Sequence, residues 1–141
     1  GGTPRDSDLY QSLKALSVAE MFARKGDDVT FILCVNGEKG VGGELFRQWM
    51  EEGGTPENVI ERFRREGFDV GTNKAFMFAR ALTKGRVIVV SDHLTQEELH
   101  RMMLDWAPNL QAALDSLAEE GKLRNVIVLP RAVSLIPVLP D

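Results

Sequence analysis

The stretch VTFILCV, residues 29–35, is apolar at every position except Thr30. A strand with one solvated face alternates apolar and polar side chains. A continuous apolar run is instead typical of a central parallel strand that helices cover on both faces. Two further runs share this character, RVIVVS at 86–91 and NVIVLP at 125–130. We therefore expect these three segments to form a mainly parallel sheet.

Helical patterns fill the intervals between the expected strands. Thr55 is a typical N-cap followed by a proline, and Thr95 with Glu98 forms a capping box. The helices are expected at about 9–25, 45–51, 56–65, 73–84, 96–102 and 109–120, with an extended arm at 134–141. The segment LDWA at 104–107 has no clear pattern. Strands alternating with helices predict one three-layer α/β/α domain spanning residues 1–141, a length that suits a single domain.

The composition and charge of the chain argue against some classes of binding partner. The net charge is -4 and the sequence has no Lys/Arg cluster, which argues against a nucleic-acid surface. No apolar run reaches the roughly 20 residues of a transmembrane helix, so we expect no membrane contact. The single cysteine, Cys34, fits a reducing cytoplasm, and we expect it to be a buried apolar thiol. The opening GGTPRD lacks Met, so the chain is treated as a possible fragment.

The loop NGEKGVGG at 36–43 lies at the carboxyl end of the first expected strand, where α/β sheets bind ligands. Backbone amides of Gly40, Gly42 and Gly43 could hold a carboxylate or phosphate there. Lys74 adds a cation at the start of a later helix, where the macrodipole disfavours one. The loop lacks the P-loop Lys-Ser/Thr and the full dinucleotide fingerprint. A purely structural tight turn is the favoured interpretation, and an anion site is the alternative.

The histidines give little indication of a metal. His93 and His100 are seven residues apart, whereas ligands on a helix prefer a spacing of three or four. We expect both histidines to be solvated and no metal site in this chain.

The run DLYQSLKAL at 8–16 places Tyr10, Gln11 and Lys14 on one sector of the first helix. A phenol, an amide and an ammonium can converge on one oxygen-rich ligand. Judged on the chemistry of the side chains alone, an ordinary solvated helix face is the favoured interpretation.

Four blocks in order resemble the C-terminal domain of the nickel-pincer-nucleotide-dependent lactate racemase family. They are GGTPRDSDLYQSLKAL, DVTFILCVNGEKGVGGELFRQWM, VGTNKAFMFARALTKGRVIVVS and AALDSLAEEGKLRNVIVLP. The resemblance implies a two-domain enzyme whose N-terminal domain holds the nickel pincer nucleotide and the catalytic histidines. It also implies reversible hydride transfer at a 2-hydroxy acid.

The family's Tyr-Gln-x-x-Lys cluster maps onto Tyr10, Gln11 and Lys14, which the resemblance makes substrate-binding residues. Thr72-Asn73 stand where the family usually has glycine-histidine, and relatives act on several 2-hydroxy acids, so the resemblance leaves the substrate open. The expected partners are a small 2-hydroxy acid and the N-terminal catalytic domain of the same chain. The 141-residue chain alone is expected to be inactive and free of cofactor.

Two other functions stay open. One is a non-catalytic α/β module that binds an anion, or regulates, through the loop at 40–43. The other is a small dinucleotide-binding domain, which the missing fingerprint disfavours.

Overall fold

The structure, a computed structural model, describes residues 2, 4–136 and 138 of the chain. Its sheet has three parallel strands in the order β1-β2-β3: β1 (Val29–Cys34), β2 (Gly85–Val90) and β3 (Asp105–Ala107). β1 and β2 pair from Val29 with Gly85 to Cys34 with Val90, and β3 joins β2 through Ile88 and Asp105. The first two strands confirm the prediction from the apolar runs.

All helices after the first begin and end close to the expected positions. The helices are α1 (Leu9–Ala19), α2 (Glu44–Gly53), α3 (Pro56–Glu66), α4 (Thr72–Leu82), α5 (Gln96–Arg101) and α6 (Leu110–Glu119), with short 3-10 helices η1 (Glu20–Phe22) and η2 (Ala132–Ser134). The Thr55 cap of α3 and the complete capping box of α5 are both formed. These local signals act over three or four residues, which is why the sequence predicts them well.

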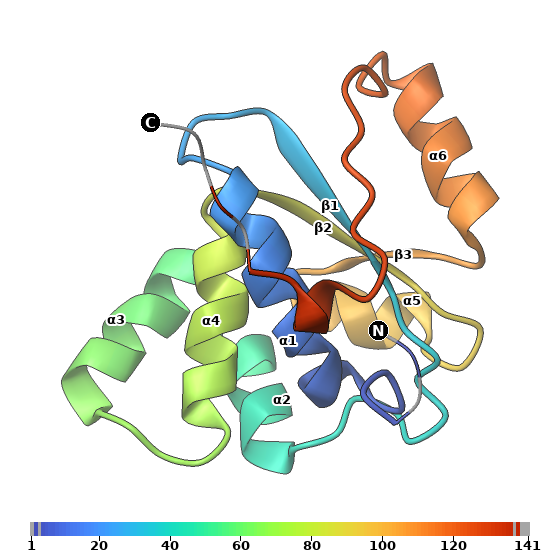
Figure 1. Cartoon of the computed structure of the whole chain (residues 1–141). Helices are drawn as coiled ribbons and strands as arrows, with labels where there is room; N and C mark the ends of the chain where they lie inside the picture. The colour runs from blue at the N-terminus through green and yellow to red at the C-terminus, as the bar shows by residue number, and fades with distance from the viewer. Residues whose placement is uncertain (1, 3, 137, 139–141) are drawn as a thin grey trace.

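Both faces of the sheet are covered, as Figure 1 shows, with α1 and α4 on one side and α6 on the other. Phe31 and Leu33 of β1 face the larger core, which α1, α2 and α4 complete. Ile88 and Val90 of β2 face a smaller core closed by α6. The predicted three-layer α/β/α class is confirmed.

The predicted strand at 125–130 is wrong, because β3 comes from the unassigned segment at 104–107. That short strand occupies the free edge of β2, where the Trp106 indole also donates to the Ser91 carbonyl at 2.9 Å. Val126, Ile127 and Val128 lie outside the sheet and are 60%, 65% and 77% exposed. An apolar β-prone run therefore does not by itself determine which segment pairs with the edge.

The first helix is shorter than expected. α1 ends at Ala19, a 3-10 turn follows, and Ala23 is extended. The buried Glu20 is the reason, since its carboxylate pairs with Arg80 and its carbonyl accepts from Lys84 Nζ at 3.0 Å. These contacts tie the end of α1 to the end of α4. Of the predicted C-terminal arm at 134–141, Ser134 is the last residue of η2 and Leu135 is extended, while residues 137 and 139–141 lie outside the described residues.

Candidate functional site

The loop at 36–43 is joined to the start of α1 by a ladder of backbone hydrogen bonds. Gly37 and Lys39 donate to the carbonyls of Asp6 and Ser7 at 3.0 and 2.9 Å. Leu9 and Tyr10 donate back to the carbonyls of Gly40 and Val41 at 3.2 and 2.9 Å. The first amides of α1 and several loop amides therefore already have partners. This leaves the α1 N-terminus with little capacity to bind an anion through its backbone.

Glycine is required where this loop passes Tyr10. Gly42 and Gly43 have φ of 70° and 47°, in the region that glycine tolerates. A Cβ on Gly43 would lie 2.7 Å from Tyr10 Cδ2, and a Cβ on Gly42 would lie 3.1 Å from Tyr10 Cβ. The other side of the ring meets Phe46 edge-on, with centroids 5.8 Å apart. The loop and α2 thus hold the Tyr10 ring in one position.

One lysine lies over this ring, and a second lysine lies close to the first. Lys74 Nζ, from the first turn of α4, is 5.3 Å from the Tyr10 ring centroid. Lys14 Nζ, one turn further along α1, donates to Gln11 Oε1 at 3.2 Å. Partial burial lowers the pKa of Lys74, and the nearby Lys14 ammonium lowers it further. We call Tyr10, Gln11, Lys14 and Lys74 the Tyr10 cluster.

The helix ends around the cluster add positive potential. The residue before α2 is Gly43 and the residue before α4 is Gly71, and neither helix has a side-chain cap among the described residues. A Cβ on Gly71 would lie 3.4 Å from the Phe46 amide nitrogen, so the two helix starts are close. In Figure 1 the first turns of α1, α2 and α4 lie at the same end of the helical layer. The uncapped starts of α2 and α4 each favour an anion by ~0.3–1 kcal/mol when exposed, whereas the Asp8 carboxylate already caps α1.

The structure thus unites residues that the sequence suggested as two sites. Three residues of the suggested anion site contact Tyr10 of the suggested substrate site: Lys74, Gly42 and Gly43. Gly40 does not belong to this group, since nothing lies within 4 Å of a Cβ on it. Gly40 closes a turn by donating to the Gly37 carbonyl at 2.8 Å. The sequence analysis missed that Lys74 reaches Tyr10. The only signal was a cation at a helix start, which does not identify its neighbour.

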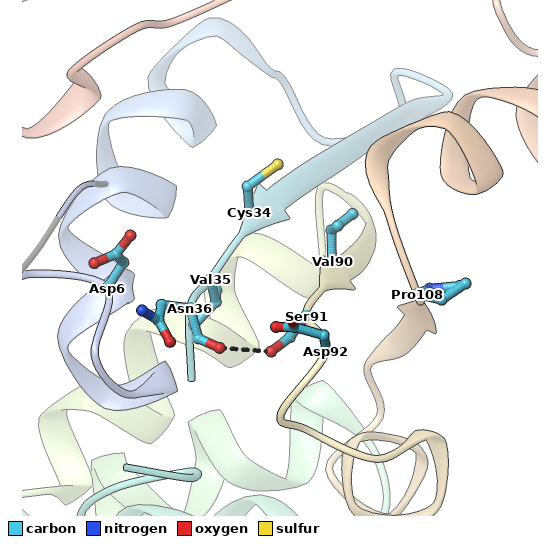
Figure 2. Close-up of a pocket in the computed structure, with 8 residues that line it drawn as sticks. All are labelled: Asp6, Cys34, Val35, Asn36, Val90, Ser91, Asp92 and Pro108. Atoms are coloured by element: carbon cyan, nitrogen blue, oxygen red, sulfur yellow. Dashed lines mark hydrogen bonds between the residues drawn. The ribbon is translucent and has the colours of Figure 1, made fainter. Parts of the chain in front are cut away.

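A shallow pocket of about 330 Å³ lies at the carboxyl ends of β1 and β2. Figure 2 shows its lining, which includes Asp6, Cys34 and Asp92, and the hydrogen bond from Ser91 Oγ to the Asn36 carbonyl at 3.0 Å. The Cys34 side chain is exposed here, so the expectation of a buried thiol was wrong. Partial burial still raises the pKa of the Cys34 thiol.

Both histidines are exposed. His93 Nδ1 lies 2.9 Å from the Asn36 carbonyl and 3.1 Å from an Asp92 carboxylate oxygen. Within the described residues, no group of three or more His, Cys, Asp or Glu side chains could hold a metal ion. The described helices also include none with the length and apolar character to cross a bilayer.

The fold defines the class as an α/β/α domain with a parallel sheet, and the comparison with known proteins gives its family. The family model described as "Lactate racemase C-terminal domain" matches residues 1–137. The chain belongs to this family.

Two curated relatives are similar over almost the whole chain. The lactate racemase of Thermoanaerobacterium thermosaccharolyticum is 31% identical over 142 residues, and that of Lactiplantibacillus plantarum is 27% identical over 146. Each alignment covers 96% of this chain and 32% of the relative. The lactate racemase apoprotein structure from T. thermosaccharolyticum superposes with a TM-score of 0.83 at 29% identity, covering 96% of this chain and 33% of that one. The chain therefore spans about a third of the length of the relatives it matches.

Proposed function

We propose that this chain is the substrate-binding C-terminal domain of a two-domain 2-hydroxy-acid racemase or epimerase, an isomerase of the lactate racemase type. The observation that supports it most directly is the Tyr10 cluster. It places an ammonium, an amide and a phenol side by side on the first turns of α1, in a domain of this family. The relatives are named lactate racemases, and the activity is carried to this chain as a proposal.

Each residue of the cluster has a distinct part in binding. Lys14 is exposed and supplies a full charge to the substrate carboxylate. The Gln11 amide orients Lys14 through its Oε1 and keeps its two N–H donors for a substrate oxygen. Tyr10, held by the glycine pair and Phe46, provides a rigid wall and a hydroxyl. A pre-positioned site of this kind loses less conformational freedom when it binds.

The nickel pincer nucleotide that the resemblance implies does not fit the residues of this chain. The described residues offer no cluster of metal ligands, and both histidines lie outside the Tyr10 cluster. We therefore propose that the cofactor, with the hydride exchange it supports, belongs to an N-terminal catalytic domain outside these 141 residues. The role of this domain is then to bind and orient the substrate at one wall of the active site.

The other two functions gain no support from the geometry. Of the three glycine amides suggested for an anion site, that of Gly40 is already bonded to the Gly37 carbonyl, which weakens an anion-binding module built on the loop backbone. A dinucleotide would draw on these glycine amides for its pyrophosphate and would lose the same donor.

The test uses the full-length protein that contains this chain. Incubation with single enantiomers of 2-hydroxy acids should give racemisation or epimerisation of at least one of them. Lys14→Ala should lower kcat/KM about tenfold to a hundredfold, the typical effect of losing a charge-assisted hydrogen bond. Its melting temperature should stay unchanged, because Lys14 is exposed and bonds only to Gln11 in the described structure.

Lys25→Ala is the matched control, since Lys25 is an exposed lysine beyond the opposite end of α1. Unchanged kinetics in Lys14→Ala, or equal losses in both variants, would contradict the proposed role of the cluster.

A further inference from the structure

The Tyr10 cluster contains two cations rather than one. Lys14 and Lys74 are sixty residues apart in the sequence, yet α1 and α4 bring them close enough for the Lys14 charge to lower the pKa of Lys74, whose ammonium lies 5.3 Å from the Tyr10 ring centroid. In the described part of the chain, no carboxylate pairs with either of them. Lys84 and Lys122, in contrast, pair with Glu20 and Asp28. The cluster therefore carries two positive charges in a chain whose net charge is negative, and the neighbouring Asp8 carboxylate caps α1 by accepting from the Gln11 backbone amide at 2.7 Å.

Such an arrangement costs free energy in the absence of a ligand. Two like charges repel, and half-burial removes part of the hydration of Lys74. The lowered pKa of Lys74, caused first by burial and then by Lys14, reflects this cost. The Tyr10 ring face offsets only part of it, because a cation–π contact contributes about 0.5–1 kcal/mol at an exposed site. A bound anion would offset much more.

One carboxylate is a poor match for two lysines on different helices. A small monocarboxylate that pairs with Lys14 leaves Lys74 without a counter-charge. A substrate with a second anionic group can satisfy both ammonium groups. The α4 N-terminus, which carries Lys74 on its first turn and has no side-chain cap in the described structure, adds potential of the same sign.

We propose that Lys74 is a specificity-determining residue and that the substrate is a 2-hydroxy acid with a second anionic group, namely a 2-hydroxy dicarboxylate. Lys14 binds the carboxylate next to the hydroxyl-bearing carbon, and Lys74 binds the distal carboxylate. This inference rests on the proposed function, because it assigns the substrate class of the same site. It extends that function, because the Tyr-Gln-x-x-Lys pattern alone does not include Lys74.

The experiment compares lactate, malate and phospholactate binding to the full-length protein by calorimetry. Malate adds a carboxylate to the 2-hydroxy-acid unit, whereas phospholactate places a phosphate on the 2-oxygen and so removes the free hydroxyl. The native protein should bind malate at least tenfold more tightly than lactate. Lys74→Met should reduce this preference tenfold or more by weakening malate alone, the scale expected for one charged hydrogen bond. Lys74→Arg, which keeps the charge, should retain the preference.

Lys25→Met is the control for removing a surface lysine, and it should leave all affinities unchanged. If Lys74 only supports the Tyr10 ring, Lys74→Met lowers the melting temperature while the malate-to-lactate ratio stays constant, and the proposal is overturned. Equal affinity of the native protein for malate and lactate also overturns it, as does tighter binding of phospholactate than of malate.

Different results would contradict the proposed function itself. They are that no 2-hydroxy acid binds, or that Lys14→Met leaves lactate binding intact. A loss of lactate binding in Lys14→Met without any malate preference would leave the proposed function standing and the dicarboxylate inference overturned.

Discussion

Gly43 and the Tyr10 ring are in such close contact that a Cβ on Gly43 would lie 2.7 Å from Tyr10 Cδ2 and 3.1 Å from Cε2. Gly43 also has φ 47° and directly precedes α2. One residue therefore sets the start of a helix and the position of the phenol that we place in the binding site. Binding and folding are coupled at this contact.

Gly43→Ala should destabilise the domain and displace Tyr10. The new methyl clashes with the ring in addition to the strain of positive φ, a combined cost of about 1–3 kcal/mol. Urea denaturation measures the free energy of unfolding. Gly40→Ala is the matched control, because Gly40 has φ 73° but open space around its Cα, so it should lose only about 1 kcal/mol. Equal losses in the two variants would contradict the role assigned to the contact.

Tyr10→Phe should separate packing from binding. The ring and its contact with Phe46 remain, and the Tyr10 hydroxyl has no hydrogen bond within the described structure, so the melting temperature should not change. Substrate affinity should fall about twofold to tenfold, the usual range for one neutral hydrogen bond. Tyr10→Ala should lower both affinity and stability, because it leaves a cavity between Phe46 and the glycine pair. Unchanged affinity in Tyr10→Phe would show that the hydroxyl does not touch the substrate.

Cys34 should react slowly with alkylating reagents near neutral pH despite its exposure. Its pKa is raised by partial burial, so the reactive thiolate is scarcer than in a free cysteine at the same pH. The rate with iodoacetamide at pH 7.5 should be below that of the same chain unfolded in urea, and the difference should shrink as the pH rises above 9. A folded-state rate at pH 7.5 equal to or above the unfolded one would contradict the raised pKa.

Ile127 and Ile88 offer a test of which apolar run belongs to the sheet. Ile88 is 2% exposed in β2, whereas Ile127 is 65% exposed in a segment outside the sheet. Ile88→Ala should cost about 2–5 kcal/mol of unfolding free energy, and Ile127→Ala less than about 0.5 kcal/mol. The measurement is chemical denaturation of this 141-residue chain. A large loss from Ile127→Ala would contradict this placement, because it would show that the Ile127 side chain is buried.

Local signals allowed much of this fold to be predicted. The Thr55 and Thr95 caps form as expected because each needs only a hydroxyl and an amide three residues away. The apolar runs at β1 and β2 are strands because both faces of the sheet are covered. The third strand was missed for the opposite reason. The segment DWA has little intrinsic pattern and becomes a strand only because the edge of β2 is available to it.

The sequence alone determined the helices, the first two strands, the Thr55 and Thr95 caps and the Tyr10–Gln11–Lys14 group, since these depend mainly on neighbours within one or two helical turns. Only the tertiary structure decided that Lys74 lies over Tyr10, that Gly43 supports the ring, and that Cys34 is exposed. These relationships join residues on different elements, some of them more than sixty positions apart. They depend on how α1, α2 and α4 pack together and on how the helices cover the ends of the strands, neither of which the period of a single helix or strand specifies.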